Sequence, residues 1–262
     1  MNTAAQALVL AAGRGERMRP LTDHTPKPLL TVRGRPLIAW HLQALQRDGV
    51  RRVVVNSAWL GPQLRATLDA EYGHQGKHNG RTALSNSEQL SIQHSAEDLD
   101  FGAALETAGG IVRALPLLQD TFWLVAADIF VPDFVFDAAA HQRFAAGDDL
   151  AHLWLVPNPP HHPRGDFGID AAGRACDPPT GDATPRLTYS TIALLRRTLF
   201  TPPWCDIEHG NPNGVKAPLA PILRAAMGRG RIGATLYTGA WTDVGTPERL
   251  ATLQVPGPLS PA

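Results

Sequence analysis

The chain has 262 residues, of which 44% are hydrophobic, so we expect one large α/β domain with a sizeable core rather than a disordered chain. Its 24 basic and 24 acidic residues balance and are scattered, which argues against a general polyanion binder and makes nucleic acid an unexpected partner. No apolar run reaches the roughly 18 residues of a membrane span, and residues 1–10 lack a signal-peptide pattern, so we expect no membrane association and a cytoplasmic location.

Short apolar runs alternate with helix-like segments through the first half of the chain. Residues 7–11 are apolar and are followed by glycines, which is typical of a buried strand. Pro36 can occupy the first turn of a helix, and apolar residues then recur at helical spacing until Gly49. By the same criteria we expect strands over residues 52–56, 91–94 and 122–126, and helices over residues 60–72 and 106–118.

This alternation predicts right-handed crossovers and a parallel sheet. Such sheets bind their ligands at the carboxyl ends of strands. Gly13 follows the first predicted strand, and Asp128 ends a later one. We therefore expect both residues at the edge of the sheet where a ligand binds.

The second half is less regular, with strands predicted near residues 152–156 and 187–194 and a helix near residues 217–227. A single domain over residues 1–255 is expected, with a polar surface insertion over residues 74–88 and a flexible tail over residues 256–262. Cys176 and Cys205 have no metal-type spacing, so we expect two reduced thiols.

Residues 10–29 combine small, basic and proline residues in one glycine-rich run. Gly13 and Gly15 permit main-chain N–H groups to converge on an anion. Arg17 adds charge, and Lys27 is held between two prolines, so it can present a fixed point charge to a phosphate. A flexible turn with solvated arginines would account for Gly13-x-Gly15 alone, but it does not account for the whole run.

Two aspartates are candidate ligands for one metal ion. Asp128 closes an apolar strand, and Asp243 lies in a turn that ends at Gly245. Mg²⁺ usually takes one or two carboxylates together with substrate phosphates and waters. The alternative is that Asp128 is a turn residue and Asp243 a helix cap, but the neighbouring phosphate loop favours the magnesium site.

The glycine-rich run resembles the signature of sugar-1-phosphate nucleotidyltransferases. The matching residues are Gly13-x-Gly15-x-Arg17-Met18-x-Pro20-Leu21-Thr22 and Pro26-Lys27-Pro28-Leu29. The resemblance implies an α/β fold with a Rossmann-like mixed sheet flanked by helices, the GT-A-like architecture of these enzymes. It also implies that Arg17 and Lys27 hold the phosphates and that Asp128 and Asp243 hold Mg²⁺. Ala126-Ala127 departs from the Asn-Gly or Gly that usually precedes the first aspartate.

Residues 105–111 resemble a second motif of the family, Leu-Glu-Thr-Gly-Gly-Gly-Ile, with Ala108 in place of its first glycine. Such a helix start can present N–H groups to a base or a phosphate, and Thr107 as a helix cap would fit equally well. The resemblance assigns catalysis to Arg17, Lys27 and Asp128. It assigns nucleotide binding to Ala11, Ala12, Gly13, Gly15, Glu16, Arg17, Lys27, Thr107, Gly109 and Ala126.

Residues 56–61 and 158–167 resemble the bacterial N-acetylmuramate α-1-phosphate uridylyltransferase group. This resemblance implies UTP and N-acetylmuramic acid 1-phosphate as substrates, in the recycling of cell-wall sugars. It places the sugar at Ile129, Asp166 and Asp243, and Thr191 stands where a glycine is usual. We expect His161-His162 to be solvated loop histidines, with Arg164 as a candidate partner for the lactyl carboxylate.

Two alternatives stay open. The same chemistry on another pair, such as mannose, glucose or heptose 1-phosphate with GTP or dTTP, depends on pocket side chains that the sequence does not place. A nucleotide-sugar sensor without catalysis is suggested by Ala126-Ala127, although the retained Arg17, Lys27 and two aspartates argue against it. The sequence does not distinguish a monomer from a small homo-oligomer.

Overall fold

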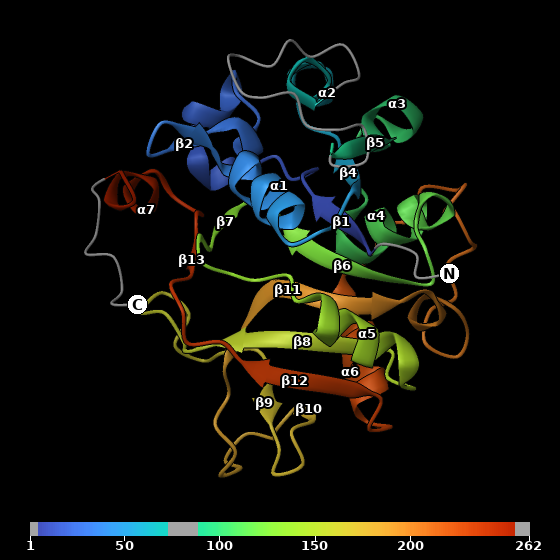
Figure 1. The fold of residues 1–262 in the computed structure, drawn as a ribbon. Helices are drawn as coiled ribbons and strands as arrows, with labels where there is room; N and C mark the ends of the chain where they lie inside the picture. The colour runs from blue at the N-terminus through green and yellow to red at the C-terminus, as the bar shows by residue number, and fades with distance from the viewer. Residues whose placement is uncertain (1–4, 73–88, 255–262) are drawn as a thin grey trace.

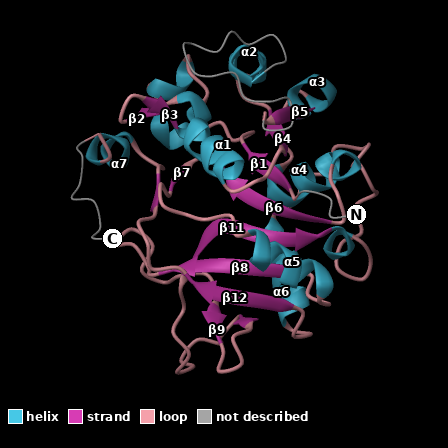
Figure 2. Cartoon of the chain, in the orientation of Figure 1, coloured by secondary structure: helices cyan, strands magenta, loops and turns pink. Residues whose placement is uncertain are grey.

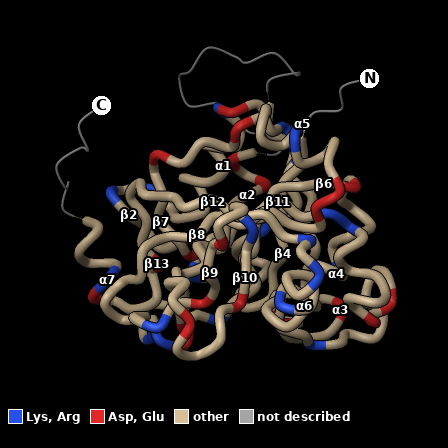
Figure 3. Tube along the Cα trace, turned by 90° about the horizontal axis from the view of Figure 1, so that it is seen from below, with Lys and Arg blue, Asp and Glu red and all other residues tan. Residues whose placement is uncertain are grey.

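The computed structural model describes residues 5–72 and 89–254; the insertion predicted over 74–88 and the tail predicted over 256–262 lie outside these residues. The described chain forms a seven-stranded sheet with helices on both faces (Figure 1). None of its helices is long and apolar enough to cross a bilayer. Basic and acidic residues are interspersed along the trace, in agreement with the balanced composition (Figure 3).

The central sheet contains one reversed strand. Its members are β1 (Gln6–Leu10), β4 (Arg52–Ser57), β5 (Ser91–Ala96), β6 (Thr121–Ala126), β8 (Ala151–Val156), β11 (Thr188–Arg196) and β12 (Ile232–Leu236). The order is β12-β8-β11-β6-β1-β4-β5, and only β11 pairs antiparallel with its neighbours β6 and β8. The mixed sheet confirms the architecture that the family resemblance implied, whereas strand–helix alternation alone predicted a parallel sheet.

Helices cover both faces of the sheet and enclose two apolar cores (Figure 2). They are α1 (Leu37–Arg47), α2 (Gly61–Tyr72), α3 (Glu97–Phe101), α4 (Glu106–Ala114), α5 (Ala138–Ala146), α6 (Leu219–Met227) and α7 (Pro247–Thr252). Helices α4 and α6 contribute to one core, and α1, α2 and α5 contribute to the other. Along β6, Phe122 and Leu124 face the first core while Trp123 and Val125 face the second, as the two-residue period of a strand requires.

Short elements account for most differences from the predicted elements. The helix predicted over 106–118 ends at Ala114 and continues as a 3-10 turn, because Pro116 has no N–H to donate. Pro36 precedes α1 rather than occupying its first turn. Three two-stranded pairs were not predicted: β2 (Thr31–Val32) with β3 (Arg35–Pro36), β7 (Ile129–Phe130) with β13 (Thr242–Asp243), and β9 (Gly168–Ile169) with β10 (Ala175–Cys176). Cys176 and Cys205 are free thiols, as predicted.

His41 on α1 makes the stability of the fold sensitive to acid. Its ring is buried, and Nε2 donates a hydrogen bond to the carbonyl oxygen of Ile129 at 2.9 Å. Burial lowers the pKa of His41 from 6.5 to about 4, and the Ile129 carbonyl and the Asp128 charge oppose this shift only in part. The unfolded chain therefore gains a proton before the folded chain does as the pH falls from 6.5 toward 4. Stability decreases over that window by at most about 1.4 kcal/mol per pH unit.

We expect His41→Gln to weaken the acid dependence of the unfolding free energy, because glutamine does not titrate. Chemical denaturation at about pH 7.5, 6 and 5 measures this dependence. The exposed His24 offers a matched control, since His24→Gln should leave the acid dependence unchanged. A His41→Gln protein with the same acid dependence as the wild type would contradict the assignment.

Candidate active site

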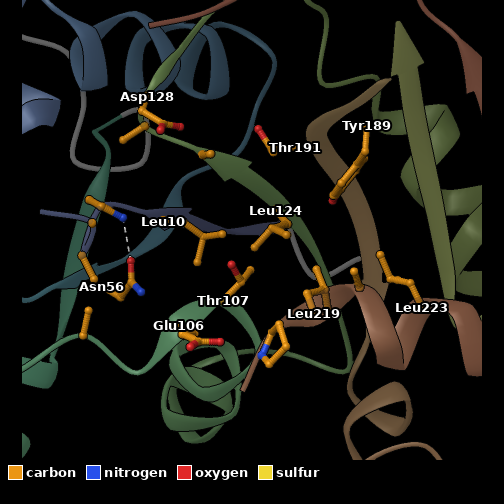
Figure 4. A pocket seen from close by; sticks show the side chains of 18 of the residues that line it. Leu10, Asn56, Glu106, Thr107, Leu124, Asp128, Tyr189, Thr191, Leu219 and Leu223 are labelled. Carbon is orange, nitrogen blue, oxygen red and sulfur yellow. Dashed lines mark hydrogen bonds between the residues drawn. The ribbon is translucent and has the colours of Figure 1, made fainter. Parts of the chain in front are cut away.

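A cavity of about 550 Å³ lies at the carboxyl ends of β1, β4 and β6, where the sequence predicts the ligand (Figure 4). This volume suits a small organic ligand. Its wall is partly apolar, through Leu10, Leu124, Leu219 and Leu223. The polar and charged side chains of the wall are Lys27, Asn56, Glu106, Thr107, Asp128, Asp166, Tyr189, Thr191 and Arg224.

The loop after β1 brings open backbone and a lysine to the cavity. Ala11, Ala12 and Gly13 line the wall, and a Cβ on Gly13 would meet no atom within 4 Å. Gly15 has a φ of 67°, and a Cβ there would lie 3.1 Å from Cδ of Lys27. Gly13 therefore leaves space beside the main chain for a ligand, whereas Gly15 lets the turn pass closely over the lysine stem.

Lys27 and Asp128 form an ion pair at the cavity wall. The Nζ atom of Lys27 lies 2.7 Å from Oδ2 of Asp128. Lys27 is 7% exposed, whereas the Asp128 side chain is 46% exposed. A buried ammonium group needs a partner of opposite charge, and Asp128 provides one. The pair joins the loop after β1 to the end of β6, as predicted, and holds a positive charge at the wall of the cavity.

Asp243 comes near Asp128 through the pairing of β7 with β13. Asp243 lies opposite Ile129, and the N–H of Val244 donates to the carbonyl oxygen of Asp128 at 2.8 Å. Nη1 of Arg249 lies 2.8 and 2.7 Å from the two carboxylate oxygens of Asp243, and Nε2 of His161 lies 2.7 Å from Oδ1. Asp243 is therefore already held by cationic side chains outside the cavity wall.

The two aspartates match the ligand chemistry of magnesium. Both offer hard carboxylate oxygens on adjacent paired segments, and Mg²⁺ commonly needs only one or two carboxylates when phosphates and waters complete its shell. Among the described residues, no group of three or more His, Cys, Asp and Glu side chains could hold a metal by itself. A metal here would consequently depend on oxygen atoms of the substrate.

Asp166 lies in the cavity wall with its carboxylate held from two sides. The N–H of Tyr189 donates to Oδ2 at 2.8 Å, and Nε2 of His162 lies 3.1 Å from Oδ1. His161 likewise contacts Asp243. The prediction that these histidines are merely solvated was wrong, because each one contacts an aspartate of the predicted site.

A buried network connects two walls of the cavity. Oδ1 of Asn56 accepts a hydrogen bond from the N–H of Ala11 at 2.6 Å, and Nδ2 donates to Oε1 of Glu97 at 2.7 Å. Oε2 of Glu97 accepts from the N–H of Leu105 at 2.8 Å. Burial raises the pKa of Glu97, and the Leu105 and Asn56 hydrogen bonds lower it in part. Glu97 thus links the phosphate loop to the start of α4, and the sequence analysis missed it.

The start of α4 differs from both interpretations of its sequence. The N–H groups of Ala108 and Gly109 donate to the carbonyl oxygen of Ala217 at 2.8 and 3.2 Å, so they do not face a ligand. Gly109 lies behind the wall, where a Cβ would be 2.4 Å from the carbonyl oxygen of Val215. Thr107 makes no capping hydrogen bond, but it lines the cavity. The packing of α4 against residues 215–217 explains why Gly109 is small.

Two other wall residues have strained backbone. Thr191 has a φ of 64° where β11 bulges between Tyr189 and Ile192, and Glu106 has a φ of 60°. A left-handed conformation of this kind costs on the order of 1–3 kcal/mol for a residue other than glycine. The glycine that is usual at position 191 is thereby explained, and the strain is concentrated at the cavity.

The remaining predicted residues divide between the wall and its surroundings. Ala126 lines the cavity. Glu16 and Arg17 are exposed in the 3-10 turn η1 (Glu16–Met18) and are not part of the wall. Ile129 is buried in the core beside α1, so its side chain does not face the cavity. The roles predicted for these residues stay predictions.

Comparison with known proteins identifies the family. The model of the MobA-like NTP transferase domain matches residues 7–161. The chain is 41% identical to N-acetylmuramate alpha-1-phosphate uridylyltransferase of Neisseria meningitidis serogroup B over 254 residues, which are 95% of this chain and 96% of the relative. It is 30% identical to the Caulobacter vibrioides enzyme of the same name, over 92% of each chain.

A solved structure supports the fold independently. The inositol-1-phosphate CTP transferase from T. maritima superposes with a TM-score of 0.67 at 15% identity, and the match covers 97% of each chain. At that identity the likeness concerns the fold alone. Together with the family match, it confirms the nucleotidyltransferase resemblance drawn from residues 10–29. The chain belongs to the MobA-like NTP transferase family.

Proposed function

We propose that this protein transfers a uridylyl group from UTP to N-acetylmuramic acid 1-phosphate, giving UDP-N-acetylmuramic acid and pyrophosphate. The observation that carries the proposal is the 41% identity to a uridylyltransferase over almost the whole of both chains. The cavity that Gly13, Lys27 and Asp128 share supports the same reaction. The reaction would serve the recycling of cell-wall sugars in the cytoplasm.

The proposed reaction is a direct, in-line displacement. A phosphate oxygen of the sugar 1-phosphate attacks the α-phosphorus of UTP, and the bond from that phosphorus to the oxygen of the departing pyrophosphate breaks. The attacking phosphate is already mostly ionised at neutral pH, since its second pKa is near ~6. The reaction therefore needs no strong general base, and alignment and charge neutralisation supply the catalysis.

Each side chain has a role in this reaction. Lys27 supplies a positive charge to the reacting phosphates, and open backbone beside Gly13 receives the phosphate chain. Arg17 is exposed in the neighbouring turn and would hold the triphosphate or the pyrophosphate. Asp128 and Asp243 would hold Mg²⁺, which neutralises phosphate charge when bound.

The alternatives have weaker support. Mannose-1-phosphate guanylyltransferase catalytic subunit beta of Danio rerio is 25% identical, and the match spans 63% of that relative. A sensor without catalysis would not need the buried Lys27 against Asp128, an arrangement that is complete here.

A substrate panel tests the proposal. Pyrophosphate release is measured with UTP, GTP and dTTP against N-acetylmuramic acid, N-acetylglucosamine, glucose and mannose 1-phosphates. We expect the highest kcat/KM with UTP and N-acetylmuramic acid 1-phosphate. Faster reaction of mannose or glucose 1-phosphate would reject this specificity and leave the nucleotidyltransferase class intact, and no release from any pair would support the sensor.

The metal assignment predicts that Asp128→Asn and Asp243→Asn each reduce kcat about a hundredfold, because a charge that stabilises the transition state is lost. Melting curves with and without Mg²⁺ and UTP give a second readout, and the stabilisation by the metal–nucleotide pair should shrink in both variants. Exposed Asp206 offers the control Asp206→Asn, which should behave as the wild type. Near-normal kcat in both variants would remove these aspartates from the metal site.

The Asn56–Glu97 network predicts a selective effect on the nucleotide. Glu97→Gln places an amide N–H₂ where two donors already point, so one hydrogen bond to Asn56 or Leu105 is lost. We expect KM for UTP to rise about tenfold, while KM for the sugar phosphate changes less. Equal changes in both KM values, with an unchanged melting temperature, would contradict a role in positioning the nucleotide side.

A further inference from the structure

Two basic side chains line the cavity among its described residues, and they differ in how far they are already paired. Lys27 is buried and paired with Asp128. Arg224, on α6, uses Nε to donate to Oδ2 of Asp177 at 2.9 Å. Its Nη groups make no hydrogen bond to any other residue within 5–72 and 89–254. Arg224 therefore brings unused donors to the cavity.

The surroundings of Arg224 carry excess positive charge. Asp177 is shared between two arginines, since Nη2 of Arg186 lies 2.5 Å from its other carboxylate oxygen. Arg186 also donates to the carbonyl oxygens of Asp166 and Pro178, so its own donors are largely used. One carboxylate thus faces two guanidinium groups, and Arg224 is the one left able to bind an anion.

The guanidinium of Arg224 has a fixed position. Its Cζ lies 5.4 Å from the centre of the Phe167 ring, and Phe167 follows Asp166 in the same wall. The preceding residue on α6, Leu223, also lines the cavity, and Figure 4 shows it with Tyr189 on the side away from Asn56. Stacking on an aromatic ring and an anchored Nε leave the outer edge of the guanidinium free, which suits a planar carboxylate.

We propose that Arg224 binds the carboxylate of the lactyl ether and thereby selects sugar 1-phosphates that carry a carboxylate. This inference rests on the proposed function. Asp166, in the same wall, would repel that carboxylate and suits a sugar hydroxyl instead. Arg164, the candidate from sequence, is exposed and is not part of the wall, so Arg224 replaces it.

The test compares two acceptors that differ in the lactyl group, N-acetylmuramic acid and N-acetylglucosamine 1-phosphates, with UTP. In Arg224→Gln, kcat/KM for the muramic acid should fall about 10- to 100-fold, as for loss of a charge-assisted hydrogen-bond pair. For N-acetylglucosamine it should stay within about threefold, because no contact to that sugar is lost. Arg224→Lys keeps the charge without the fork and should fall in between, and Arg229→Gln on the exposed turn after α6 is the matched control.

A measurement on the wild type does not depend on how the variants fold. The methyl ester of the lactyl carboxylate should react no better than N-acetylglucosamine 1-phosphate. An ester as good as the acid, or an Arg224→Gln protein that loses both acceptors equally, would overturn the role of Arg224. A wild type that prefers mannose or glucose 1-phosphate would instead overturn the proposed function itself.

Discussion

The ion pair between Lys27 and Asp128 is the constraint on which the rest of the site depends. An ammonium group that is 7% exposed is tolerable only beside an opposite charge, and here that charge comes from the end of β6. The pair fixes the loop after β1 against the neighbouring strand and places one cation at the cavity wall before any substrate arrives. Charges that are already in position need little reorganisation during reaction, which is the main source of catalysis where the nucleophile is already ionised.

The sequence predicted those features whose cause is local. The period of apolar residues located six of the seven sheet strands, because buried strands leave a short, continuous apolar signature. The edge strand β12 was missed, since Ile232 to Leu236 combines a glycine and a threonine with an exposed end. The direction of β11 also did not follow from alternation, because no local pattern records whether a strand pairs parallel or antiparallel, and it was the family resemblance that implied a mixed sheet.

The residues that the sequence did not reveal act through contacts between distant segments. Glu97 joins Asn56 to Leu105, and Arg249 holds Asp243, yet a buried glutamate and a helix arginine look ordinary in sequence. The histidines at 161 and 162 looked like solvated loop residues for the same reason. One signal was available: Gly110 would place a Cβ 2.6 Å from Oε1 of Glu97, so a small residue in the family motif marks a buried polar neighbour.

The division of the chain follows the division of the chemistry. The family model matches residues 7–161, which contain Gly13, Lys27 and Asp128. The other side of the cavity is built after residue 161, from the Asp166 loop, from β11 with its strained Thr191, and from α6. Phosphate chemistry is common to all members of such a family, so its residues can stay on the shared strands β1 and β6. The acceptor differs between members, and the face of α6 that packs Leu223 into both the core and the cavity wall is where a single exposed residue can change the choice of sugar without disturbing the sheet.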